Sequence, residues 1–305
     1  MIDIIIPAYN AHETIEKTLY SICLQVNRNM FNIYIINDGS KKDYNKICNK
    51  FKNILNIKEL KLEKNKGPGF ARNYGIKNSN SDYLLFMDSD DILYDSYSVK
   101  NLYDKIHNND LDIVLSSIYD ECEINNYIYY NVHLYNLHGK MFRRSFIEKN
   151  NIEFLNTKCN EDTVFMYMAK LLTDKIDNIK LPTYVHQYNK KSITNSKDFW
   201  FKNIKIMCEN GIILIDFINN RNIDIYKGSY IIGTILMIVY YQYLDFYNRK
   251  DSNKIINWAS NFYNKSKILL KNLNENDLNN IYYNFYTNKI PEISFYEFIE
   301  KLKNN

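Results

Sequence analysis

Short apolar runs of β type alternate with helix-like segments through the first half of the chain. This alternation is typical of an open α/β sheet that carries helices on its faces. The predicted strands are residues 2–6, 32–36, 57–62, 83–87 and 111–115, and the predicted helices are residues 12–24, 43–52, 70–78 and 96–107. In such sheets, ligands bind outside the carboxyl ends of the strands. Functional residues are therefore expected in the turns that follow the strands.

Each of the first four predicted strands runs into a polar or glycine-containing turn. These turns are Pro7-Ala8-Tyr9-Asn10, Asn37-Asp38-Gly39-Ser40, Lys64-Asn65-Lys66-Gly67-Pro68-Gly69 and Asp88-Ser89-Asp90-Asp91. Four turns on one edge of a sheet predict a cleft at that edge. Beyond residue 118 the sequence is aromatic and irregular, and residues 140–151 then suggest another helix.

Charge and cysteine usage exclude several classes of protein. The 305 residues include 39 basic and 35 acidic side chains, and the net charge of +4 is too evenly spread for a nucleic-acid binder. The five cysteines form no C-x-x-C pair, so neither a disulfide framework nor a zinc site is indicated and a reducing cytoplasm is expected. The N-terminal MIDIIIPAYN has no basic region before its short apolar run, so no signal peptide is predicted.

From about residue 197 onward, the chain changes to long helix-like stretches with few prolines or glycines, which predicts a separate helical subdomain. Its longest uncharged run is residues 228–244. That run is slightly short for a membrane span and contains Ser229, Thr234, Gln242 and several tyrosines, so a buried helix is favoured. Binding at a membrane surface stays open.

Three carboxylates crowd the turn after the fourth predicted strand. Asp88, Asp90 and Asp91 repel one another unless they are protonated or neutralised by a cation, and their hard oxygen ligands suit Mg²⁺ or Mn²⁺. The alternative is that they only end the strand and cap the next helix. An EF-hand loop is excluded, because the positions that require glycine and glutamate are occupied by Leu93 and Val99.

The glycine turn that begins at Gly67 resembles a dinucleotide-binding fingerprint but lacks its third glycine. Arg72 stands at that position, where a long side chain would obstruct close helix packing, so a dehydrogenase is disfavoured. A P-loop is also absent from the sequence. Arg72 is interpreted as a contact for an anion, with a solvated helix residue as the alternative.

Four segments together resemble one enzyme family. They are IDIIIPAYNAHETIEKTLYSI, IYIINDGSKKD, NKGPGFARNYGI and YLLFMDSDD, and their order and spacing resemble the large inverting glycosyltransferase family 2, which has the GT-A fold. A further stretch, from HGKMFRRSFIEKNNIEF through NEDTVF, resembles the acceptor side of that family. The resemblance implies a GT-A domain over residues 1–195, with a nucleotide-sugar half at about 1–110 and an acceptor half at about 111–195. A helical subdomain over 196–305 follows.

The resemblance places the nucleotide-sugar donor at the strand-end turns. Tyr9 would offer an aromatic face to the base, and Asp38 would accept the imide N–H of a pyrimidine. That contact favours uridine over cytidine, while thymidine and guanosine carry a comparable N–H. Arg72 would face the nucleotide or diphosphate, and Asp88 the ribose or the donor sugar. The full implied set is Pro7, Ala8, Tyr9, Asn10, Glu13, Asp38, Gly67, Arg72, Asp88, Ser89 and Lys140.

The resemblance also implies a divalent cation, Mn²⁺ or Mg²⁺, that stabilises the departing nucleoside diphosphate. Asp90 would hold the cation, with Asp91 in support. His186 is a third candidate ligand, and a structural histidine is its alternative interpretation. Lys140 matches a basic position of the family, against the default of a solvated lysine. Lys190, Lys191 and Ser192 could contact phosphate, although the arginine that the family often has in this loop is missing.

An inverting transfer needs a base on the opposite face of the donor sugar, to take the proton of the acceptor hydroxyl. Glu161 and Asp162 match the E-D motif of the family, with Asp162 as the base and Glu161 as the second choice. Without the resemblance, an acidic first turn would be interpreted as helix capping.

The predicted activity is transfer of a hexose or N-acetylhexosamine from a nucleotide-diphosphate sugar to an acceptor hydroxyl on a surface glycan, a polysaccharide, a lipid-linked glycan or a protein. UDP is favoured over dTDP and GDP as the nucleotide. A non-catalytic scaffold or carbohydrate-binding protein with the same fold is the alternative. A nucleotidyltransferase is disfavoured, because its glycine- and arginine-rich first loop is replaced by PAYN. The expected location is the cytoplasm or the inner face of the membrane. Peripheral membrane contact or self-association through the C-terminal helices fits the same pattern.

Overall fold

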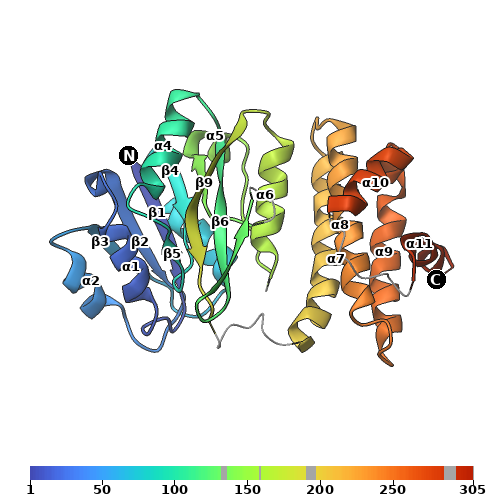
Figure 1. Ribbon diagram of the computed structural model, residues 1–305, viewed down its shortest axis with the longest axis horizontal. Coiled ribbons are helices and arrows are strands. Elements are labelled where there is room, and N and C mark those ends of the chain that lie inside the picture. Colours follow the sequence, from blue (N-terminus) through green and yellow to red (C-terminus); the bar gives the residue numbers. More distant parts are fainter. Residues whose placement is uncertain (132–135, 158, 190–196, 285–292, 305) are drawn as a thin grey trace. The chain divides into compact units, whose positions relative to one another are not determined.

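The structure is a computed structural model that describes residues 1–131, 136–157, 159–189, 197–284 and 293–304. The chain divides into two compact units, residues 1–190 and residues 191–305. Figure 1 shows that the first unit is an α/β unit and the second is helical, as the sequence predicts. The predicted boundary at residue 195 lies outside the described residues and stays a prediction.

The first unit contains strands and helices in alternation. The strands are β1 (Ile2–Ala8), β2 (Phe31–Asn37), β3 (Asn56–Lys61), β4 (Tyr83–Phe86), β5 (Ile92–Leu93), β6 (Ile113–Glu123), β7 (Asn126–Tyr130), β8 (Lys140–Arg143) and β9 (Ile176–His186). The helices are α1 (Ile15–Cys23), α2 (Asn45–Phe51), α3 (Pro68–Lys77), α4 (Ser98–Asn108), α5 (Arg144–Lys149) and α6 (Glu161–Leu171), with a short 3₁₀ helix at Arg28–Met30.

Within the described residues, these strands form one mixed sheet in the order β3-β2-β1-β4-β8-β6-β9-β5, with β7 beside β6. The strands β1 to β4 run parallel, so the turns after β1, β2 and β4 meet at one edge. The strand β8 runs antiparallel to β4, with Met141 opposite Leu85, so Lys140 begins β8 at that same edge. The parallel pairing of β6 with β9 places Asp120 opposite His186 there as well.

Helices cover both faces of the sheet (Figure 1). On one face, apolar residues of α1, α2 and α4 pack with alternate residues of β1, β2 and β4 in one continuous core. On the other face, Phe165 of α6 packs against Phe86, Phe142 and Phe154, and its ring stacks on Phe154 with centroids 4.0 Å apart. Buried aromatic pairs of this kind fix helix position. They hold the first turn of α6 near the place where the turns after β1, β2 and β4 meet.

Two segments differ from the sequence-based expectation. The irregular stretch after residue 118 is a hairpin of β6 and β7, in which Tyr119 pairs with Tyr129. Every residue of β7 is exposed, so no alternation of apolar and polar side chains marked it as a strand. The helix expected at residues 140–151 is shorter: residues 140–143 form β8 and only residues 144–149 are helical.

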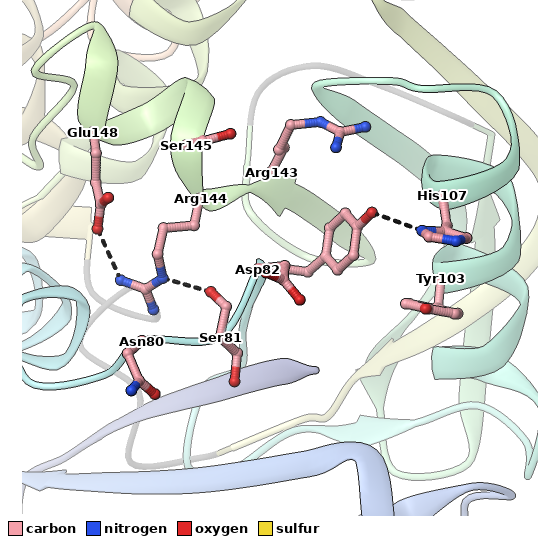
Figure 2. Close-up of a pocket in the computed structure, with 10 residues that line it drawn as sticks. Asn80, Ser81, Asp82, Tyr103, His107, Arg143, Arg144, Ser145 and Glu148 are labelled. Atoms are coloured by element: carbon pink, nitrogen blue, oxygen red, sulfur yellow. Dashed lines mark hydrogen bonds and ion pairs between the residues drawn. The ribbon is translucent and has the colours of Figure 1, made fainter.

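A buried ion pair ties the strands together at the other end of the sheet, where β1 and β4 begin. Figure 2 shows Arg144 beside Ser81 and Glu148 in a pocket of about 290 Å³. The guanidinium of Arg144 also lies 2.7 Å from the carboxylate of Asp3, which is fully buried in β1 and accepts hydrogen bonds from Ser81 and Asn32. A buried charge is stable only when paired and hydrogen-bonded in this way. The pocket is thus part of the scaffold.

The second unit contains α7 (Lys197–Asn219), α8 (Ile225–Leu244), α9 (Ser252–Leu270), α10 (Glu275–Asn284) and α11 (Phe295–Lys303). The uncharged run at residues 228–244 lies within α8, and most of its side chains are buried, as predicted. The hydroxyl of Tyr240 donates to the carbonyl of Ile293 at 2.7 Å, which attaches the segment before α11. No helix among the described residues has the length and apolar character that a membrane crossing requires.

Candidate active site

The acidic turn after β4 begins with Asp88, whose carboxylate contacts the guanidinium of Arg72 and the imidazole of His138. Arg72 donates from Nη2 to Oδ1 of Asp88 at 2.7 Å, and Nε2 of His138 lies 3.3 Å from Oδ2. The backbone N–H of Asp88 donates to the hydroxyl of Tyr184 at 3.1 Å. Burial opposes ionisation of Asp88, but Arg72 and His138 outweigh it and hold the pKa of this carboxyl well below its usual range. Asp88 is therefore a fixed negative charge.

The last carboxylate of the turn, Asp91, is completely buried. Its Oδ2 accepts from the hydroxyl of Tyr184 at 2.8 Å, and its Oδ1 accepts from the backbone N–H of Gln187 at 2.9 Å. Burial, with the charges of Asp88 and Asp90 adding to it, raises the pKa of Asp91 well above its usual value. Asp91 thus fastens the turn to the end of β9 and would bind a cation only with loss of its proton.

Asp90 and Ser89 lie between these two residues and are partly exposed. Oδ2 of Asp90 accepts from Nδ2 of Asn189 at 2.8 Å. The turn therefore directs Asp90 toward the segment after β9, while Asp88 and Asp91 face His138. The assignment of Asp90 as the principal cation ligand stays a prediction.

Two histidines stack at the site. The ring of His138 stacks on Tyr184 with centroids 4.9 Å apart and on His186 with centroids 5.3 Å apart. Nδ1 of His186 lies 2.7 Å from Oδ1 of Asp120 on β6. Burial lowers the pKa of His186, but Asp120 and the acidic turn outweigh it and raise that pKa to about 9. His186 is thus protonated at neutral pH in this arrangement, and its role as a cation ligand stays a prediction.

A buried arginine joins the acidic turn to α6. Arg72 is 5% exposed and donates from Nη1 to Oε1 of Glu161 at 2.7 Å, in addition to its contact with Asp88. Its interpretation as a solvated helix residue is therefore wrong. The close approach of α3 to Leu155 and Glu161 requires glycine at the start of α3. An added Cβ on Gly69 would overlap the carbonyl oxygen of Leu155 and press on Glu161.

The first turn of α6 carries Glu161 and Asp162. Glu161 binds Arg72, so this residue does more than cap the helix. Oδ1 of Asp162 accepts from the backbone N–H of Thr163 at 2.8 Å. Burial and the neighbouring charge of Glu161 raise the pKa of Asp162 to about 7, against the opposing effect of Arg72. Such a carboxylate can exchange a proton near neutral pH.

Lys140 is buried at the start of β8, with only 1% of its surface exposed. Its ammonium donates to Oδ1 of Asn136 at 3.0 Å and to the carbonyl of His138 at 3.2 Å. Burial lowers the pKa of Lys140 to about 7, and the charge of Asp162 opposes that effect. The default of a solvated lysine is therefore wrong.

The turns after β1 and β2 form the predicted nucleotide side. Pro7 and Ala8 are buried in β1, Tyr9 is 55% exposed, and Glu13 is exposed just before α1. The backbone N–H of Asn10 donates to Oγ of Ser40 at 2.9 Å, which links the two turns.

Asp38 also ties this side to the turn before α3. Its two carboxylate oxygens accept from the backbone N–H groups of Lys66 at 2.8 Å and Gly67 at 2.9 Å, and Gly67 has a positive φ of 90°. Each oxygen keeps a second lone pair, so the contact of Asp38 with a base stays a prediction. Lys190, Lys191 and Ser192 lie outside the described residues.

Sequence reasoning missed four residues at the site. Asp120 and Tyr184 lie in strands whose pairing was not predicted, and Asn189 follows β9. His138 was visible in the HGKMF segment, but one histidine before a strand carries no signal by itself. In the described residues, one ligand atom each from Asp88, Asp91 and His138 lie within 4.8 Å of one another. A set of two carboxylates and one imidazole fits a divalent cation.

A model of the family described as Glycosyl transferase family 2 matches residues 3–174, more than half of the chain. The chain belongs to this family. The poly(ribitol-phosphate) beta-N-acetylglucosaminyltransferase TarP of Staphylococcus aureus is 29% identical over 188 residues, covering 54% of the chain and 55% of TarP. The glycosyltransferase GlyA of Streptococcus pneumoniae is 27% identical over 221 residues, covering 63% of the chain and 31% of GlyA. The chain thus spans less than two thirds of either relative.

Solved structures have the same fold. Residues 1–349 of S. aureus TarS, in complex with UDP-GlcNAc, match with a TM-score of 0.70 at 20% identity, covering 92% of this chain and 89% of that one. The mannosyltransferase PcManGT from Pyrobaculum calidifontis, in complex with GDP-Man and Mn²⁺, matches with a TM-score of 0.56 at 11% identity, covering 88% of this chain and 74% of that one. The likeness to TarS confirms the GT-A fold and includes the C-terminal helices.

Proposed function

We propose that this family 2 glycosyltransferase inverts the anomeric centre as it moves a hexose or an N-acetylhexosamine from a UDP-sugar to an acceptor hydroxyl. The acceptor would belong to a surface glycan, a polysaccharide, a lipid-linked glycan or a glycoprotein. One observation carries the proposal: Arg72 binds both Asp88, after β4, and Glu161, at the start of α6. The expected donor side and the expected base are thereby held in one arrangement.

Asp162 is the proposed base. The acceptor oxygen attacks the anomeric carbon while its proton passes to the carboxylate of Asp162, and the electron pair of the bond to the diphosphate leaves with UDP. A base is most effective when its pKa lies near the working pH. The pKa of Asp162, raised to about 7 by burial and by Glu161, meets that condition.

The departing diphosphate requires positive charge nearby. Carboxylates of the acidic turn, Asp90 and Asp91 with Asp88, would hold Mn²⁺ or Mg²⁺, which supplies Lewis-acid stabilisation of the leaving group. His186, a cation at neutral pH, lies at the end of β9 beside this turn. Its charge would attract the diphosphate as long as the ring does not bind the metal, because a metal-bound imidazole is neutral.

The donor class rests on two supports. Asp38 has free lone pairs on a carboxylate that backbone N–H groups hold in place, which suits the imide N–H of uracil. The structure of TarS that shares this fold holds UDP-GlcNAc. We therefore propose UDP-GlcNAc as the first donor to test.

The test measures nucleotide release from UDP-, GDP- and dTDP-sugars, with Mn²⁺ and a panel of glycan acceptors. We expect acceptor-dependent release of UDP that EDTA abolishes and Mn²⁺ or Mg²⁺ restores. Asp162→Asn should lower the rate by roughly 10²–10⁴-fold, the usual contribution of a general base. Asp104→Asn makes the same charge change at a half-buried position of α4, where Asp104 pairs with Lys100, and should leave the rate unchanged.

Two results would overturn the proposal. One is Asp162→Asn activity close to that of the unmodified chain with the correct donor and acceptor. The other is binding of UDP-sugars with no transfer to any acceptor, which would favour a carbohydrate-binding protein instead. Transfer that is unaffected by EDTA would remove the metal from the mechanism and leave the base in place.

A further inference from the structure

We propose that His138 supplies a nitrogen ligand to the divalent cation of this site and thereby makes the site prefer Mn²⁺ over Mg²⁺. The inference rests on the proposed cation site at the acidic turn. It adds a residue that lies outside the acidic turn and a reason for metal selectivity. Sequence reasoning assigned neither.

The distances match a shared cation. Nε2 of His138 lies 3.3 Å from Oδ2 of Asp88 and 3.7 Å from Oδ2 of Asp91. Ligand atoms about 2.1 Å from one cation in neighbouring octahedral positions are about 3 Å apart. The two distances from His138 exceed that spacing by less than an ångström, and the three ligand atoms all lie within 4.8 Å of one another. Oδ1 of Asp88 is engaged by Arg72, so it is Oδ2 that faces the imidazole.

The ring of His138 is held in place before any ion arrives. It lies nearly parallel to Tyr184 and His186, at interplanar angles of 8° and 15°. Tyr184 in turn binds the acidic turn, through its hydroxyl donating to Asp91. One aromatic residue thus orients both the imidazole and a carboxylate, as supporting side chains do at metal centres.

The backbone around His138 is fixed as well. Its carbonyl accepts from the ammonium of Lys140, which is buried. Gly139 has a φ of 64°, and an added Cβ there would overlap the hydroxyl of Ser116. These contacts therefore hold the backbone of His138 in place just before β8. A prearranged ligand loses little entropy on binding.

The chemistry of the imidazole sets the selectivity. Mg²⁺ prefers oxygen ligands and keeps much of its water, whereas ions of the first transition series, including Mn²⁺, accept imidazole nitrogen. Two carboxylates alone would serve both ions. Removing His138 should therefore weaken Mn²⁺ binding and leave Mg²⁺ binding nearly unchanged.

The test titrates the full chain with Mn²⁺ alone, following free Mn²⁺ by electron paramagnetic resonance, and measures Mg²⁺ by competition. His138→Phe keeps a ring to stack on Tyr184 but has no ligand atom, and His138→Ala is the second variant. His107→Gln, at the other edge of the sheet, is the control. We expect both His138 variants to lose roughly tenfold or more in Mn²⁺ affinity, with less than about threefold change for Mg²⁺.

The inference fails if Mn²⁺ affinity in His138→Phe equals that of the control, or if both ions weaken equally. A matching loss in His186→Phe but not in His138→Phe would transfer the nitrogen ligand to His186. Since the titration contains no sugar nucleotide, it can show the metal preference even if the protein transfers no sugar. Failure of the transferase activity and failure of the metal assignment are therefore distinguishable.

Discussion

Replacing the proposed base should stabilise the protein in a manner that depends on pH. Asp162 has a pKa raised from 3.8 to about 7 by burial and by the charge of Glu161. The folded chain therefore binds a proton at this site more readily than the unfolded chain does. Between about pH 4 and pH 7 the ionisation of Asp162 progressively destabilises the fold, and the full effect is present above about pH 7.

The size of the effect follows from the shift. A difference of about 3 pKa units corresponds to at most about 4 kcal/mol, since one unit is about 1.36 kcal/mol. Asp162 keeps some solvent exposure, and we take half of that value, about 2 kcal/mol at pH 8. At pH 5 less than half of the ionisation effect has developed, so the gain should be below about 1 kcal/mol. Asp162→Asn removes the charge and so removes this destabilisation.

Differential scanning calorimetry of the full chain at pH 5 and pH 8 measures the gain. A gain of 2 kcal/mol raises the melting temperature of a unit of this size by about 4–8 °C. Both tryptophans, Trp200 and Trp258, belong to residues 191–305. Their fluorescence identifies the transition of the second unit, which should not move. Asp104→Asn is the matched control.

The outcome that would refute the reasoning is a gain in the first unit that is equal at the two pH values, because it could not come from ionisation of Asp162. A loss of stability at pH 8 would contradict it more directly. It would mean that the attraction between Asp162 and the buried guanidinium of Arg72 exceeds the combined effect of burial and Glu161.

Two further predictions follow from the same structure. The kcat/KM of sugar transfer should fall tenfold per pH unit below about pH 7, as Asp162 gains its proton. Glu161→Gln should move this fall to lower pH, because it removes a like charge beside Asp162. A fall that begins only near pH 4 in the unmodified chain would contradict the prediction. Arg144→Met should destabilise the first unit by about 3–5 kcal/mol because it leaves the buried carboxylate of Asp3 unpaired. Arg143→Met should change stability by less than about 1 kcal/mol, because its nearer carboxylate partner, Asp110, is exposed and Asp112 is more distant. Equal losses of stability in Arg144→Met and Arg143→Met, measured by calorimetry, would show that the burial of Asp3 does not decide the effect.

The sequence predicted the sheet because its central strands are short, apolar and followed by turn residues. The bounds of β1, β2, β3 and β4 agree with the expected strands to within two residues. The hairpin of β6 and β7 was not predicted, since tyrosines on both of its faces give no period of two. The strand β8 was read as helix because its four residues continue directly into α5. Short strands that are specified by their neighbours leave little local signal.

The site could be predicted as a set of positions but not as a set of contacts. Turn chemistry and the family motifs pointed to Arg72, Asp88 and Asp162. The stack of His138 and His186 depends on β6 pairing with β9, so that Asp120 stands opposite His186. That register is a property of the folded sheet, and no local pattern encodes it. The burial of Lys140 was invisible for the same reason.

Arg72 limits how parts of this chain could be exchanged with those of other family members. It balances one carboxylate after β4, Asp88, and one at the start of α6, Glu161, which belong to the predicted donor and acceptor halves. A chimera joined between the two halves would take the arginine from one parent and the glutamate from the other. If the second parent has no acidic residue at the position of Glu161, the arginine keeps only its donor-side partner inside a dry interior. Recombination of donor and acceptor specificities is therefore restricted to parents that share this pair of charges.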